Sequence, residues 1–146
     1  MRHALPILIA TLTLLPTAPV GAQDGDVTRL SLDTYMDMES VSNPQISPDG
    51  RRIVYTRGWI DKLNDRRMSS LWTINADGSR ARELLEGGGA RWSPDGTRIL
   101  FTTTGEPSGS QIFVRWMDAE GATTQITRLE NGPSNVRWSP DGKWIA

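Results

Sequence analysis

The chain of 146 residues contains no cysteine and a single histidine, His3. The lack of cysteine excludes a disulfide framework and a lipid-modified N-terminal cysteine. Because His3 lies at the very start, the rest of the chain can form neither a serine–histidine–acid triad nor a zinc site with histidine or cysteine ligands. We therefore predict that this chain contributes no catalytic residue, and that it binds no cofactor and no metal.

An excess of charge of one sign is missing too. Sixteen Lys and Arg residues stand against seventeen Asp and Glu residues, and no basic run occurs. A nucleic-acid partner or a polybasic contact with a membrane surface is therefore not expected. The nucleophile pattern G-x-S-x-G is also absent, and Gly87-Gly88-Gly89 is not followed by the Gly-Lys-Ser/Thr of a phosphate loop. We interpret these glycines as a connection between structural units.

Long hydrophobic runs are limited to the N-terminus, where residues 4–18 are largely apolar but too short and too proline-broken to span a membrane. Arg2 and His3 form a basic start before this stretch, and Val20-Gly21-Ala22 follows it as a small-residue cleavage site. This order predicts a secretory signal peptide over residues 1–22 and no membrane anchor. We expect an exported protein, periplasmic or secreted, of a bacterium.

Residues 23–42 separate the signal peptide from the repeated part of the chain. A short helix is predicted within them, with Ser31 or Asp33 as its N-cap. We expect this segment to dock the N-terminus against the rest of the protein.

The strongest positive signal is the tetrad Ser-Pro-Asp-Gly, which occurs three times, each copy beginning 46 residues after the previous one. A fixed period of this size indicates a chain built of repeated supersecondary units. Proline presets φ for a β-turn, glycine accepts a positive φ, and the serine and aspartate side chains bond nearby amides. Each tetrad is therefore predicted to be a turn between strands. The turn residues are Ser47, Pro48, Asp49 and Gly50; Ser93, Pro94, Asp95 and Gly96; and Ser139, Pro140, Asp141 and Gly142.

The residues around each turn have the character of β-strands, as in Ile53-Val54-Tyr55 and Ile99-Leu100-Phe101. Four antiparallel strands in each period are typical of a propeller blade. The predicted fold class is therefore all-β, with blades over residues 43–146 whose repeats start near residues 43, 90 and 135. Since a closed propeller needs about four to eight blades, these two and a fraction form an incomplete propeller. The later strands are expected at residues 71–74, 81–85, 111–117 and 124–129.

Trp92 and Trp138 stand directly before the second and third turns. We expect both indoles to pack between adjacent blades rather than to stack on a ligand or a base. Asp49, Asp95 and Asp141 each lie alone in a turn, without the alternating oxygen ligands of a calcium loop. They are therefore interpreted as turn residues and not as metal ligands.

Two segments are candidates for recognition, because both would join the second and third strands of a blade on the same rim. One is a loop over residues 59–69, which contains the adjacent Arg66 and Arg67, and the other covers residues 105–109. Arginine side chains can hold a carboxylate by two parallel hydrogen bonds. Arg66 and Arg67 are therefore candidate contacts to a substrate or a neighbouring domain, with a solvated loop as the alternative.

The pattern Trp-Ser-Pro-Asp-Gly-x-x-Ile-x-Phe at residues 92–101 resembles the blades of TolB-like periplasmic proteins and of the prolyl oligopeptidase family of serine peptidases. Residues 46–55 and 138–145 carry the same resemblance. Ahead of the blades, residues 30–35 and 41–50 resemble the start of secreted acylaminoacyl-peptidase and dipeptidyl-peptidase-like members of that family. The peptidases are therefore the closer resemblance.

This resemblance, which covers about residues 30–146, implies a propeller that restricts the access of short peptide substrates to a partner, the C-terminal α/β-hydrolase domain of the full-length protein. That domain is not in this chain, so the implied function is that of the propeller fragment of a secreted serine peptidase. A non-enzymatic TolB-like propeller that binds periplasmic proteins is the alternative. A complete chain whose edge strands pair into an oligomeric propeller is a third hypothesis.

Overall fold

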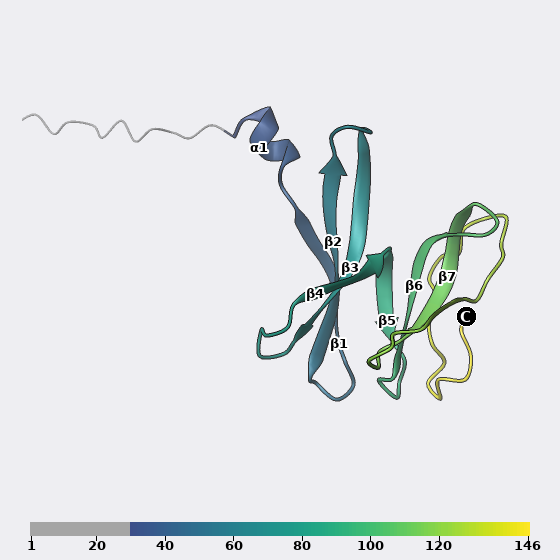
Figure 1. Ribbon diagram of the computed structural model, residues 1–146. Helices are drawn as coiled ribbons and strands as arrows, with labels where there is room; N and C mark the ends of the chain where they lie inside the picture. The colour runs from purple at the N-terminus through teal and green to yellow at the C-terminus, as the bar shows by residue number, and fades with distance from the viewer. Residues whose placement is uncertain (1–29) are drawn as a thin grey trace, which may run out of the picture.

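Two four-stranded antiparallel sheets make up most of the computed structural model, which describes residues 30–146 (Figure 1). The first sheet has the strand order β1-β2-β3-β4 and the second β5-β6-β7-β8. Each sheet is a meander of consecutive strands, which confirms the predicted all-β blades. The elements are α1 (Leu32–Met36), β1 (Ser40–Ile46), β2 (Arg52–Asp61), β3 (Arg66–Asn75), β4 (Arg82–Glu86), β5 (Gly88–Trp92), β6 (Arg98–Gly105), β7 (Gly109–Trp116) and β8 (Thr123–Gln125).

Two predicted parts lie outside the described residues: the signal peptide, residues 1–22, and the first part of the docking segment, residues 23–29. The rest of that segment leads directly into the first sheet, because β1 begins at Ser40. Within residues 30–146, no helix is long and apolar enough to cross a membrane.

The predicted short helix is present as α1. Its N-cap is Ser31, whose hydroxyl accepts a hydrogen bond from the backbone N–H of Thr34 at 3.1 Å. No residue of the helix is buried. Directly after it, Asp37 forms an ion pair of 2.5 Å with Lys62 at the tip of the first blade. An exposed pair of this kind contributes about 0–1 kcal/mol, so α1 is held only lightly against the sheet.

The predicted loop over residues 59–69 is wrong, since most of it is a hairpin. β2 continues to Asp61 and β3 begins at Arg66, and Trp59 pairs with Met68 between them. The ladder continues beyond this pair, because Ile60 pairs with Arg67 and Asp61 with Arg66. Apolar and charged residues alternate irregularly here, and such a pattern indicates a loop. Asp61 closes the short turn by accepting hydrogen bonds from backbone N–H groups within it.

The core lies between the two sheets. Val54 and Leu71 reach it from the first sheet, and Ile99 and Phe101 reach it from the second, and all four are fully buried. Phe101 also stacks on Phe113, with 5.8 Å between the ring centres. Burying one such side chain stabilises the fold by about 1.5–3 kcal/mol, so this shared apolar layer holds the blades together.

The fourth strand of the second blade is shorter than predicted, because β8 ends at Gln125 while the predicted strand continues to Leu129. Beyond β8, the buried side chain of Gln111 forms hydrogen bonds with the backbone of the following segment. The amide oxygen of Gln111 accepts a hydrogen bond from the backbone N–H of Leu129 at 3.0 Å. The amide nitrogen of Gln111 donates one to the backbone carbonyl of Leu129 at 2.8 Å. The N–H of Ile112 donates to the hydroxyl of Thr127 at 2.9 Å. These side-chain bonds satisfy groups that a longer strand would have paired.

The third repeat differs from the prediction of strands on both sides of its turn. Trp138 and Ile145 form one isolated bridge, and Arg137 exchanges two backbone hydrogen bonds with Ala146, of 2.8 and 3.0 Å. The residues on either side of this turn therefore form a short bridged segment and not a pair of strands. The two complete sheets do not close into a ring, which confirms the predicted incomplete propeller.

Candidate functional site

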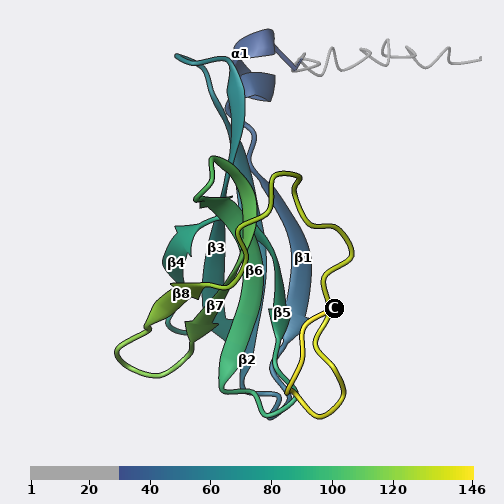
Figure 2. The ribbon, with the colours of Figure 1, turned by 90° about the vertical axis from the view of Figure 1, so that its right-hand side faces the viewer.

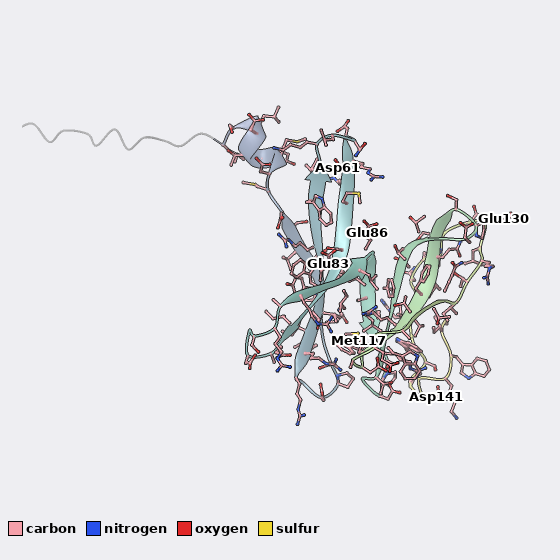
Figure 3. The ribbon with its side chains drawn as sticks, viewed as in Figure 1. Asp61, Glu83, Glu86, Met117, Glu130 and Asp141 are labelled. Carbon is pink, nitrogen blue, oxygen red and sulfur yellow. The ribbon has the colours of Figure 1, made fainter. Side chains whose placement is uncertain are left out.

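Strands are joined at two opposite ends of the molecule (Figure 1). The turn rim carries the three Ser-Pro-Asp-Gly turns. The hairpin rim carries the turn between β2 and β3 and the turn between β6 and β7. Figure 3 shows Asp61 toward the hairpin rim and Asp141 at the turn rim. The turn rim consists of the repeated serine–aspartate turns, whereas the hairpin rim carries charged side chains such as Asp61 and Arg66.

The second turn shows how a tetrad is built. The hydroxyl of Ser93 donates a hydrogen bond to the carboxylate of Asp95 at 2.5 Å and accepts one from the N–H of Arg98 at 3.0 Å. The same carboxylate oxygen accepts a hydrogen bond from the N–H of Thr97 at 3.0 Å. Gly96 has φ +68°, a conformation that residues with a side chain rarely adopt.

The first and third turns repeat this arrangement. Ser47 donates to Asp49 at 2.5 Å, and Ser139 donates to Asp141 at 2.6 Å. The pKa of each turn aspartate, including Asp95, is lowered. The chief cause is the hydrogen bond that the carboxylate accepts from the serine hydroxyl, and the next is the one that it accepts from a backbone N–H. Each carboxylate therefore faces its own turn. Among residues 30–146, no cluster of three or more His, Cys, Asp or Glu residues could hold a metal ion.

Trp92 and Trp138 lie at the joints between successive repeats. The indole N–H of Trp92 donates to the backbone carbonyl of Gln45 at 3.1 Å, and that of Trp138 donates to the carbonyl of Arg91 at 3.2 Å. Donor and acceptor are 47 residues apart in both bonds. The two joints are therefore equivalent in the repeat.

An arginine covers each of these indoles. The guanidinium of Arg52 lies 5.1 Å from the ring centre of Trp92, and that of Arg98 lies 5.0 Å from the ring centre of Trp138. Such cation–π contacts are worth about 0.5–2 kcal/mol. Arg52 also donates to the carbonyl of Met117 in the next blade at 2.8 Å. Sequence reasoning missed both arginines, although their 46-residue spacing is a signal that could have found them.

Arg66 and Arg67 lie in β3, not in a loop. Adjacent residues of a strand point to opposite faces of the sheet, so the structure separates the two guanidinium groups. Arg66 pairs with Asp61 at 3.5 Å, and its side chain is 61% exposed. Arg67 forms no ion pair with a described residue. Arg67 is therefore the arginine available for a contact at this rim.

Arg67 opens onto a cavity of about 400 Å³ between the two blades, which we name the rim groove. The rim groove brings both predicted recognition segments together, since Gly109, the first residue of β7 and the last of the predicted segment 105–109, also lines it. Figure 3 shows Glu86 where β4 leads into β5, so the groove holds a carboxylate as well as a guanidinium. Its lining consists of Arg67, Met68, Ser69, Glu86, Gly87, Gly88, Thr102, Thr103, Thr104, Gly109 and Ser110.

A second cavity of about 400 Å³ lies between α1 and the first sheet, and it shares residues 67–69 with the rim groove. Tyr35, Met38 and Trp59 give it apolar walls. Thr56 also lines it; this residue is 7% exposed, and its buried hydroxyl has no hydrogen-bond partner. Sequence reasoning pointed to Trp59 as part of the segment 59–69 but did not find Tyr35, Met38 or Thr56, because these residues come together only when strands and helix are placed in space.

Comparison with solved structures shows the fold. The acylaminoacyl peptidase of Pyrococcus horikoshii matches with a TM-score of 0.66 and 17% identity, over 77% of this chain and 17% of that one. The β-propeller domain of the trilobed protease of Pyrococcus furiosus matches with a TM-score of 0.63 and 20% identity, over 77% of this chain and 34% of that one. The two sheets are therefore propeller blades.

The curated proteins that match include two bacterial peptidases. The peptidase YuxL of Bacillus subtilis is 29% identical over 121 residues, which are 80% of this chain and 18% of that protein. Dipeptidyl-peptidase 5 of Porphyromonas endodontalis is 26% identical over a 155-residue alignment, which covers 99% of this chain and 22% of that protein. The chain is therefore similar in sequence to peptidases and in fold to the propeller blades of peptidases.

Dipeptidyl-peptidase 5 among the curated relatives and acylaminoacyl peptidase among the solved structures carry the names that the sequence resemblance implies, so that resemblance is confirmed. No family model matches the chain. The chain spans about a fifth of the length of the curated proteins that it matches.

Proposed function

We propose that this chain forms the first blades of the propeller of an exported serine peptidase, in which the propeller restricts the access of short peptides to an α/β-hydrolase domain. One observation supports this most strongly: the curated relatives are named as peptidases, and they match 80–99% of this chain. Those relatives are about five times longer, which leaves room for a separate catalytic domain. The signal peptide predicted at residues 1–22 supports export to the periplasm or the medium.

In this proposal, the rim groove is the surface that meets the peptide. Its guanidinium, carboxylate and hydroxyl groups suit a ligand with a polar backbone and charged ends. Arg67 binds a carboxylate of the peptide, or of the neighbouring domain, by charge-assisted hydrogen bonds. Arg66 is outside the groove and keeps its pair with Asp61.

The decisive experiment begins with the gene beyond the codon for Ala146. We expect further Ser-Pro-Asp-Gly repeats and then a G-x-S-x-G motif with a downstream aspartate and histidine. The full-length protein should hydrolyse dipeptidyl p-nitroanilides and react with a fluorophosphonate probe. A full-length protein that contains no such motif, or that cleaves no short peptide, would contradict the proposal.

The role of the rim groove is tested in the full-length enzyme by Arg67→Gln, with Arg66→Gln as the matched control. Losing one charge-assisted contact should raise KM about tenfold and leave kcat unchanged for Arg67→Gln. The control should behave as wild type, because Arg66 lies outside the groove. Equal KM values for both variants would exclude the rim groove as the contact surface.

Export is tested separately, by N-terminal sequencing of the protein recovered from the periplasm or the medium. Cleavage after Ala22 should leave Gln23 as the first residue. A protein that keeps residues 1–22 or stays in the cytoplasm would contradict the export part alone.

A further inference from the structure

The first strands of successive repeats converge on one groove near the turn rim. Figure 2 shows β1 and β5 side by side on the right, with β4 and β8 on the left. The two indole hydrogen bonds described above join β1 to β5, and β5 to residues 135–138. Propeller blades surround a central channel. Because first strands adjoin and β4 and β8 are the opposite sheet edges, we name this cavity the channel groove.

The channel groove has a volume of about 390 Å³. Its lining uses the same repeat positions three times, together with serine and proline residues of the turns. The position two residues before each turn is occupied by Gln45, Arg91 and Arg137 in the three repeats. The position directly before each turn is occupied by Ile46, Trp92 and Trp138. Two arginines and two tryptophans therefore contribute to the lining of one groove, where the first strands of the repeats meet.

The two guanidinium groups of this groove have no counterion. Neither Arg91 nor Arg137 forms an ion pair with a carboxylate in the described part of the chain. The side chain of Arg91 makes one long hydrogen bond, of 3.4 Å, to the carbonyl of Ala90. The lining of the groove includes no aspartate or glutamate. The nearby turn carboxylate of Asp95 accepts its hydrogen bonds within its own turn and from Arg98.

We propose that the channel groove binds carboxylate groups of peptides, so that the propeller favours acidic peptides over neutral ones. Arg91 and Arg137 supply charge-assisted hydrogen bonds, and the half-buried indoles of Trp92 and Trp138 supply apolar surface beside them. The later hydrolysis of such a peptide rests on the proposed function, whereas the binding itself needs no catalytic domain.

The test measures fluorescence anisotropy of two labelled, C-terminally amidated tetrapeptides, Ala-Glu-Glu-Ala and Ala-Gln-Gln-Ala, with the whole protein. The acidic peptide should bind about tenfold more tightly, and this advantage should shrink as salt is raised. Arg91→Gln and Arg137→Gln should each remove most of the advantage. Arg91→Lys should keep part of it, because the charge remains. Equal binding of the two peptides by the wild-type protein would overturn the proposal.

The matched control is Arg66→Gln, which removes the same charge at the hairpin rim and should leave the preference unchanged. If it weakens acidic binding as much as Arg91→Gln does, the preference reflects net charge and not the channel groove. Circular dichroism checks that each variant is folded. A full-length enzyme that cleaves neutral peptides normally but shows no acidic preference overturns this inference alone. Acidic binding without any hydrolysis overturns only the proposed function.

Discussion

The turn rim and the hairpin rim differ in how closely the repeats agree. At the turn rim, three tetrads share the same residues and the same hydrogen bonds. At the hairpin rim, β2 and β3 have ten residues each, β6 and β7 have eight, and α1 accompanies only the first blade. A blade therefore requires its turn chemistry but tolerates variation in its hairpin, and such variable ends are where binding surfaces are commonly built.

The turn rim also joins the blades to each other. Pro48 of the first turn lies against Gly96 of the second, and Pro94 of the second lies against Gly142 of the third. The tryptophan of each joint lies directly before the turn. Substitutions in the turns and at the joints should therefore destabilise the fold, whereas substitutions at the hairpin rim should have little effect on stability. Each prediction below tests that contrast by the free energy of unfolding in denaturant.

The largest effect is expected for Trp92→Ala. It removes an indole packed between the blades, its hydrogen bond to Gln45 and its contact with Arg52, which should cost about 3 kcal/mol. The control is Trp144→Ala, because Trp144 is 73% exposed and should change stability by less than about 0.5 kcal/mol. Similar losses for both variants would contradict the special role of the joint.

Ser93→Ala comes next. Ser93 is fully buried, and losing its hydroxyl removes the acceptor of the N–H of Arg98 and one of the donors to Asp95, which should cost about 1–3 kcal/mol. Ser139→Ala removes the same bonds at a more exposed turn and should cost less, because water replaces them there. A larger loss at Ser139 would show that burial does not determine the strength of these turns.

Gly96→Ala and Gly50→Ala form a matched pair. Both glycines have φ near +70°, so an alanine at either position should cost about 1–2 kcal/mol. At Gly96 the added Cβ would also lie 3.3 Å from the ring of Pro48, whereas nothing lies within 4 Å of it at Gly50. Gly96→Ala should therefore cost more, and an equal cost would mean that Pro48 does not press on the turn.

A smaller effect is expected for the pH dependence of stability. The pKa of Asp95 is lowered from its ordinary 3.8 in the folded protein, so the carboxylate stabilises the fold above about pH 3.8 and loses this contribution as the pH falls below it. Asp95→Asn should flatten the decline in stability on the acid side. Parallel acid curves for the variant and the wild-type protein would contradict this assignment.

The smallest effect is expected at the hairpin rim. Arg66→Ala removes an exposed ion pair with Asp61, which should change stability by less than about 1 kcal/mol. A loss comparable to that of Trp92→Ala would remove the contrast between the two rims.

Much of the blade architecture could be predicted from sequence, because its signals are local. The turns at Ser47, Ser93 and Ser139 and the strands beside them follow from residue types within a few positions. The hairpin over residues 59–69 was missed because its pairing, such as that of Ile60 with Arg67, lies across two strands and leaves no alternating pattern along either one. The early end of β8 was missed as well, since it depends on the buried amide of Gln111 and its contacts with a distant loop.

The candidate site could be predicted only in part. Arg66 and Arg67 are adjacent in sequence, but the strand that contains them turns their side chains to opposite faces. The lining of the rim groove needs two blades side by side, and residues such as Glu86 carry no sequence signal of that neighbour. The channel groove is partly readable in retrospect, because Arg91 and Arg137 share a repeat position.

The amino-acid sequence alone determines the repeated unit, because the bonds that define each turn span no more than five residues. Tertiary structure decides which surfaces those units present. The indole bonds between repeats join residues 47 positions apart, and both grooves are lined by several strands. Such contacts form only after blades have packed through their apolar faces, so no local pattern could specify them.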